Sequence, residues 1–205
     1  MFDSDLIYTE IPMSKIVKIL AAVSMLAATP LMAQVGSLSD GSLMESKPAA
    51  PPRPPVPENV TSEIIGDWDL RCSKEGPDPK PCVLYQTLVD QENYPIIEVE
   101  LAKMPEGGTV AAQATFIAPL QTLLGAGLGI AVDGVLVQRV PFIFCHGGGC
   151  IARMSLSPIE VKALKEGTEG VAVIYHALTP EKPVQVRLSL TGITKAYDRA
   201  TPVPQ

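Results

Sequence analysis

The stretch GIAVDGVLV (residues 129–137) decides the fold, because it predicts two strands joined by a two-residue turn. The apolar residues on each side favour strands, and Asp133-Gly134 between them suits the positive backbone angles of a tight hairpin turn. We therefore expect Gly129–Val132 to pair antiparallel with Val135–Val140.

Short apolar or alternating runs, bounded by glycine, proline and aspartate, continue on both sides of this hairpin and predict more strands. The predicted strands, with the hairpin included, are Trp68–Cys72, Cys82–Val89, Ile96–Ala102, Thr109–Ile117, Gly129–Val132, Val135–Val140, Ile143–Cys145, Cys150–Leu156, Val171–His176 and Val184–Leu190. Many strands with few helices predict a mostly β fold: an antiparallel β-sandwich or open barrel with one or two short helices.

One short helix has a complete set of local signals. Ser157 is the expected N-cap, Glu160 stands three residues after it, and Gly167 is the expected stop. The sequence therefore predicts a helix over Pro158–Glu166, with proline at its first position. A second helix is expected near Thr194–Ala200.

Residues 1–33 have the basic, apolar and small-residue parts of a secretory signal peptide. Lys15 and Lys18 precede an apolar run of only about ten residues, which is short of the roughly twenty that a membrane-spanning helix needs. We expect cleavage after Ala33 and export of the protein. An uncleaved anchor is the alternative, and Met13 is an alternative start.

The chain then divides into a linker, one domain and a tail. Residues 34–61 are rich in proline, which predicts an extended, semi-rigid linker that holds a domain away from the membrane. Residues 62–200 are long enough for one β domain with its own core, and residues 201–205 form a short tail. The formal net charge of −6 gives no electrostatic reason to bind nucleic acid.

The four cysteines are Cys72, Cys82, Cys145 and Cys150. In an exported chain they favour disulfides, although four cysteines allow three pairings and sequence alone does not choose among them. Local pairing is the simplest, because each close pair flanks a segment rich in glycine or proline that must turn. Zinc ligation is the alternative, but the spacing of Cys72 and Cys82 does not suit a tetrahedral site.

Catalytic candidates are few. The run His146–Gly149 is similar to an oxyanion loop of esterases, but that reading needs a Gly-x-Ser-x-Gly elbow, and the sequence has none. His176 ends an apolar strand, where a packed or edge histidine is expected. Trp68, the lone tryptophan, is expected to anchor the core.

Two carboxylate pairs and one apolar segment complete the candidates. Asp67/Asp69 and Glu98/Glu100 have the spacing that places both members on one strand face, and a solvated sheet face explains them more simply than glycoside chemistry. Residues 118–128 are expected to be core or a buried loop, with a membrane-contacting surface as the alternative.

An ordered set of motifs resembles the invasion-associated locus B family of alphaproteobacterial envelope proteins. The motifs are Gly66–Cys72, Cys82, Gly129–Gly134, Pro141-Phe142 leading to Cys145, Gly149–Ala152, Leu164–Gly167 and Leu188–Ile193. They span nearly the whole expected domain. The group is specific as an ordered set, although each motif alone is weak.

The resemblance implies an exported, non-enzymatic envelope protein without a cofactor, found in the periplasm or at the outer membrane. In pathogenic members it implies a link to host-cell invasion. It also implies that Cys72, Cys82, Cys145 and Cys150 form structural bridges, and it carries over no catalytic residue.

From the residues and the resemblance together we expect an interaction module that binds an envelope or host-surface protein, with peripheral outer-membrane association as a further expectation. One alternative is a periplasmic carrier of small molecules or lipids, with a cavity lined from residues 118–128. The other alternative is a hydrolase centred on His146.

Overall fold

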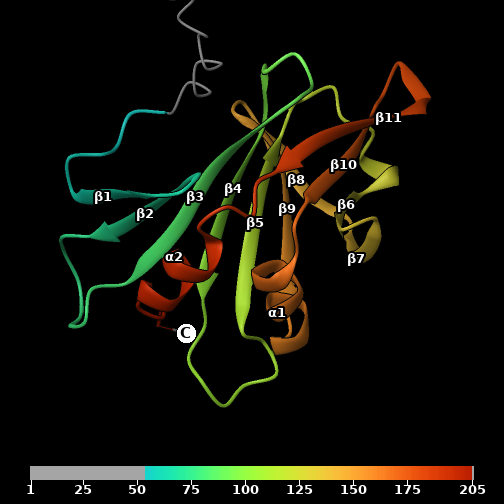
Figure 1. Ribbon diagram of the computed structural model, residues 1–205. Coiled ribbons are helices and arrows are strands. Elements are labelled where there is room, and N and C mark those ends of the chain that lie inside the picture. The colour runs from blue at the N-terminus through green and yellow to red at the C-terminus, as the bar shows by residue number, and fades with distance from the viewer. Residues whose placement is uncertain (1–53, 205) are drawn as a thin grey trace, which may run out of the picture. The chain divides into compact units, whose positions relative to one another are not determined.

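A computed structural model describes residues 54–204 of the chain (Figure 1). The expected signal peptide and the linker up to residue 53 lie outside the described residues. Within them, no helix is long and apolar enough to span a membrane. The elements are β1 (Val60–Ile65), β2 (Trp68–Ser73), β3 (Cys82–Val89), β4 (Pro95–Lys103), β5 (Ala112–Ala118), η1 (Leu124–Ala126), β6 (Leu128–Val132), β7 (Val135–Val140), β8 (Phe142–His146), β9 (Gly149–Leu156), α1 (Pro158–Glu166), β10 (Gly170–His176), β11 (Thr179–Leu188) and α2 (Ile193–Arg199).

The described strands form one antiparallel, 11-stranded sheet, and its main path runs β7-β6-β10-β11-β3-β4-β5-β9-β8. β1 and β2 branch from this path, because β2 pairs with β3. The path ends at β7 and β8, which only Pro141 separates in the chain. The sheet therefore comes nearly round on itself, which confirms the predicted mostly β, open-barrel fold with short helices.

The predicted hairpin is present. Val132 of β6 pairs with Val135 of β7, and both turn residues have positive φ, 49° at Asp133 and 78° at Gly134. A turn with two positive φ angles matches the right-handed twist of the strands that it joins. The Asp-Gly signal thus fixes the pairing of the residues next to the turn, and a β-bulge at Val137 shifts the register beyond them.

Side chains alternate between a packed and an outer face along the central strands. In β5 the buried residues are Ala112, Ala114, Phe116 and Ala118, and the residues between them are half-buried. Strand side chains repeat with a period of two, so these four point into one core. Phe116 is 1% exposed there, and burying such a ring contributes about 1.5–3 kcal/mol.

The two helices lie side by side on one face of the sheet, in front of it in Figure 1. α1 has the predicted bounds and capping box, in which Glu160 accepts hydrogen bonds from the backbone N–H and the hydroxyl of Ser157. α2 buries Ile193, Ala196 and Tyr197. The Tyr197 hydroxyl donates to the Ala111 carbonyl at 2.7 Å, which ties α2 to the start of β5.

One strand was not predicted, and the largest differences in strand boundaries are at the starts of β11 and β5. The sequence analysis expected no strand at β1, whose first residue, Val60, lies in the expected linker. Most residues of β1 are exposed, so its sequence does not need the alternation of apolar residues that predicts a strand. Its pairing with β2 holds it in place. β11 begins at Thr179 rather than Val184, and β5 begins at Ala112 rather than Thr109.

The end of the described chain also contacts the domain. The backbone N–H of Cys82 donates to the Thr201 carbonyl, and the N–H of Val203 donates to the Lys103 carbonyl at 3.0 Å. Residues 201–204 therefore lie against the ends of β3 and β4.

Candidate functional site

Both cysteine pairs form local disulfides. Cys72 is bonded to Cys82 and Cys145 to Cys150, and the members of each pair lie opposite each other in the register of β2/β3 and of β8/β9. Each bridge thus links two strands that are already paired. No free cysteine occurs among the described residues, so these thiols are not available for the zinc alternative.

His146 lies at the exposed tip of the β8–β9 hairpin. The backbone N–H of Gly148 donates to its Nδ1 at 3.1 Å, and the ring of Phe144 lies 6.1 Å away between centroids. The glycine run therefore makes a tight turn around the imidazole. This geometry gives the hydrolase alternative no support, because a general base needs a nucleophile within hydrogen-bond reach.

His176 holds a loop in place. It ends β10, its Nε2 contacts Gln121 Oε1 at 2.9 Å, and its Nδ1 accepts the N–H of Leu178. An isolated bridge pairs Thr122 with His176. The two histidines belong to different hairpins and are not brought into one site.

Two glycines with positive φ lie where the first and last motifs meet. Gly66 (φ 64°) lies in the β1–β2 turn, and Gly192 (φ 86°) precedes α2. A Cβ at Gly66 would lie 2.4 Å from the Thr191 carbonyl oxygen, and a Cβ at Gly192 would lie 2.3 Å from that of Ile65. The first and last motifs of the sequence analysis therefore dock on each other backbone to backbone.

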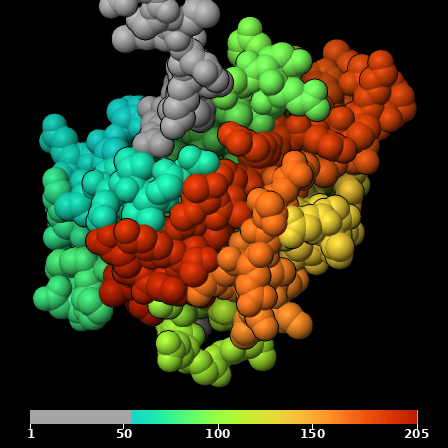
Figure 2. All heavy atoms as spheres, viewed as in Figure 1, coloured from blue at the N-terminus to red at the C-terminus, as the bar shows by residue number. Residues whose placement is uncertain are grey.

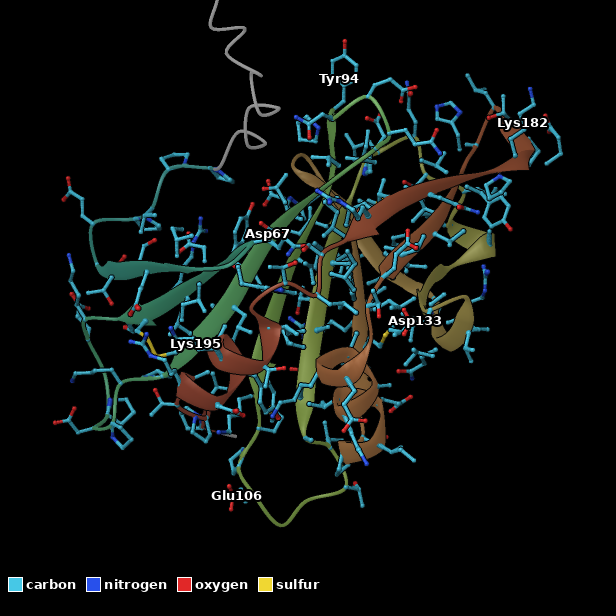
Figure 3. The ribbon with its side chains drawn as sticks, in the orientation of Figure 1. Asp67, Tyr94, Glu106, Asp133, Lys182 and Lys195 are labelled. Carbon is cyan, nitrogen blue, oxygen red and sulfur yellow. A yellow bond between two sulfur atoms is a disulfide. The ribbon has the colours of Figure 1, made fainter. Side chains whose placement is uncertain are left out.

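Polar groups around Ser189 complete this junction, near Asp67 in Figure 3. Trp68 is buried, as predicted, and its Nε1 donates to the Ser189 carbonyl at 2.9 Å. The Ser189 hydroxyl donates to Asp67 Oδ2 at 2.6 Å. Asp67 lies in the turn before β2, so Asp67 and Asp69 do not share a strand face.

Asp69 corrects the prediction of a solvated carboxylate, because its exposed fraction is 3%. Arg71 Nε donates to Asp69 Oδ2 at 2.8 Å, and the Arg71 guanidinium lies 3.7 Å from the ring centroid of Tyr85. An ion pair under a stacked guanidinium is what makes a buried carboxylate tolerable. Burial raises the pKa of Tyr85 to about 12.

The second carboxylate pair agrees with its prediction. Glu98 is half-buried and Glu100 is exposed, and the β4 residues between and beside them are buried. The two side chains therefore lie on the outer face of the sheet. The described residues contain no group of three or more His, Cys, Asp or Glu side chains that could hold a metal ion.

Residues 118–128 are only partly core. Leu128 is buried, but Leu120 and Leu124 are 58% and 47% exposed, so the prediction of a buried segment is wrong for these two. They lie in the loop after β5 and in η1, outside the sheet. Two surface grooves, one beside β11 and one beside β7, include no residue of this segment, which gives the carrier alternative no support.

The sequence analysis missed the exposed apolar side chains of the two strands that end the sheet. Val135 and Leu136 of β7 are 69% and 59% exposed, and Ile143 and Phe144 of β8 are 57% and 53% exposed. The signal was available, because both strands begin with consecutive apolar residues rather than an alternation. Consecutive apolar residues place apolar side chains on both faces of a strand.

Comparisons with known proteins agree on one group. The family model described as invasion associated locus B (IalB) protein matches residues 68–201. Two "invasion protein B homologs" of Brucella abortus strains are each 30% identical over 142 residues, which cover 69% of this chain and 79% of the relative. The crystal structure of invasion associated protein B from Bartonella henselae shares the fold, with a TM-score of 0.56, 20% identity, and coverage of 68% of this chain and 94% of that one.

Proposed function

Because the chain belongs to the invasion associated locus B family, we propose that it is an exported cell-envelope protein that acts by binding a partner protein and not by catalysis. The family names give no enzymatic activity, and the two disulfides suit an oxidising compartment.

The exposed apolar side chains on β7 and β8 carry this proposal. Large apolar residues on the strands that end a sheet mark surfaces at which proteins pair, because unpaired backbone groups there accept another strand. By contrast, three side chains of reactive types make structural contacts. His176 holds a loop, Asp69 pairs with Arg71, and Cys145 is in a disulfide.

Location and partner follow from the same proposal. The signal peptide of residues 1–33 would direct the chain to the periplasm, the outer membrane or the medium. The partner would be an envelope or host-surface protein and not a nucleic acid. A peripheral association with the outer membrane, and a role in host-cell invasion in pathogenic relatives, belong to this proposal.

Cell fractionation with a non-reducing peptide map tests the export. We expect the protein in the envelope fraction, beginning at Gln34, with peptides that join Cys72 to Cys82 and Cys145 to Cys150. An uncleaved chain with free thiols in the cytosol would overturn the proposal.

A further inference from the structure

A surface groove of about 620 Å³ lies between β7 and α1. Three consecutive residues of β7, Val135 to Val137, line one wall, and Ile159 and Ala163 of α1 line the other. Val135 and Leu136 point to alternate faces of the strand, and Val137 lies at a β-bulge, so a wall made of all three follows the edge of the strand. Figure 2 shows the β6–β7 segment, in yellow, directly beside the orange segment that contains α1.

Among the described residues, no second strand pairs with the edge of β7 that faces away from β6, although part of β7 lies near β9. β7 ends the sheet path and pairs with β6 alone. Val132 and Val135 close a two-residue turn, so they exchange backbone hydrogen bonds with each other, and the alternation directs the N–H and C=O of Leu136 away from β6. An extended segment can add to such an edge through main-chain hydrogen bonds.

The groove is held open by bonds within the fold. The Asp133 carboxylate accepts the backbone N–H groups of Thr168 and Glu169 at 3.0 and 2.9 Å, which fixes the hairpin turn to the segment after α1. Figure 3 shows Asp133 on this side of the hairpin. Gly167 lets the end of α1 approach β6, because a Cβ there would lie 2.3 Å from Val132 Cγ1. A preformed groove lowers the entropy lost on binding.

The charges around the groove select the chemistry of its occupant. Asp133, Glu160 and Glu166 are among the lining residues, and lysine and arginine are not, although Lys162 Nζ lies 3.9 Å from Glu166 Oε1. Opposite charge favours the encounter and fixes the register of a bound segment. An occupant therefore needs apolar side chains for the walls and basic side chains for the acidic rim.

We propose that the groove between β7 and α1 binds an extended segment of a partner protein, in which apolar residues alternate with lysine or arginine, as an added strand on β7. This inference rests on the proposed function and names the surface and the partner chemistry.

Fluorescence anisotropy with the full chain tests the groove directly. The probe is a fluorescein-labelled peptide of about ten residues with alternating valine and lysine, which is long enough for one added strand. We expect saturable binding. The double substitution Val135→Ser/Ile159→Ser should weaken binding at least about tenfold, since two apolar walls are lost. Both side chains are largely exposed, so the fold should persist, which circular dichroism checks.

Leu178→Ser is the matched control, because Leu178 is 81% exposed in another hairpin, and it should leave binding unchanged. Two altered peptides separate the contribution of charge to binding from that of main-chain hydrogen bonds. Glutamate in place of lysine tests the acidic rim, and N-methylation of alternate amides tests the main-chain hydrogen bonds. Each change should weaken binding at least about tenfold.

Binding that ignores N-methylation, or that Val135→Ser/Ile159→Ser leaves intact, would overturn the inference. It would also be overturned if this double variant instead abolished self-association in sedimentation velocity, or binding to phosphatidylglycerol vesicles. Absence of peptide binding by a chain that is exported and disulfide-bonded would reject the groove alone. Peptide binding by a chain that is not exported would reject the proposed function alone.

Discussion

The side-chain amide of Gln86 pairs with the backbone of Ser189 in the way that a neighbouring strand would. Its Oε1 accepts the Ser189 N–H at 2.9 Å, and its Nε2 donates to the Ser189 carbonyl at 3.1 Å. β3 pairs with β2 only as far as Tyr85 and with β11 only at Val89. Gln86 therefore fills the gap at which two branches of the sheet meet.

Replacing Gln86 should destabilise the fold. Gln86→Leu leaves the half-buried Ser189 N–H without its acceptor, which costs about 1–3 kcal/mol. Urea unfolding measures the loss. Gln113→Leu, at a half-buried position of β5, is the control and should change the free energy of unfolding by less than about 0.5 kcal/mol. Equal effects of the two substitutions would contradict this role of Gln86.

Alanine substitutions at Gly66 and Gly134 distinguish the cost of backbone strain from the cost of a steric clash. Both have positive φ, but a Cβ at Gly134 meets nothing within 4 Å, whereas a Cβ at Gly66 would lie 2.4 Å from a carbonyl oxygen. Gly134→Ala should cost about 1–2 kcal/mol, the penalty for a left-handed alanine. Gly66→Ala should cost at least about 2 kcal/mol more, since backbone must move. Thermal or urea unfolding compares them, and similar losses would show that the contact at Gly66 can relax.

Alkaline pH should destabilise the protein through Tyr85. Burial raises its pKa from 10.0 to about 12 in the folded state. From pH 10 to pH 12 the unfolded chain therefore loses a proton that the folded chain keeps, and the free energy of unfolding falls by at most about 1.4 kcal/mol per pH unit for this group. Tyr85→Phe should reduce this slope and leave the slope from pH 6 to pH 9 unchanged. An identical alkaline slope in both proteins would refute the assignment.

The two disulfides should contribute unequally to stability. They enclose sequence separations of 10 and 5 residues, and doubling a loop adds about 0.6 kcal/mol of closure entropy. Cys72→Ala/Cys82→Ala should therefore lower the free energy of unfolding by about 0.6 kcal/mol more than Cys145→Ala/Cys150→Ala. Each pair loses one buried sulfur, Cys82 or Cys150, so the packing losses are comparable. A larger loss at the shorter loop would contradict the loop-entropy account.

Helix-capping and turn residues in the sequence predicted the elements whose bounds depend on contacts between near neighbours in the chain. The bounds of α1 follow from Ser157, Pro158 and Glu160, and the pairing of β6 with β7 next to their turn follows from Asp133-Gly134, because each signal acts within a few residues. The family motifs likewise indicated the family that the comparisons then found. The exposed edge residues were readable in the sequence as consecutive apolar residues, but their place at the ends of the sheet depends on the complete strand order.

Other features depend on tertiary contacts that no local pattern contains. Proline disfavours a strand, yet β11 runs through Pro180 and Pro183 near the tip of its hairpin, where the edge away from β10 has no described strand partner until Arg187. The burial of Asp69 depends on Arg71 stacking over Tyr85 from the next strand. Gly167 was predicted as a helix stop, but the contact that requires glycine there is with Val132 of β6.

Site-specific photo-crosslinking in living cells tests the central claim, that this is an interaction module that binds through the strands ending its sheet. A photoreactive residue is placed at Val135 or at Ile143, and at Ser155, an exposed residue of β9, as the control. We predict a discrete adduct in the envelope fraction from Val135 or Ile143, absent from Ser155, and lost from Val135 when Ile159→Ser is added. No adduct from either edge strand, or the same adduct from Ser155, would contradict the account.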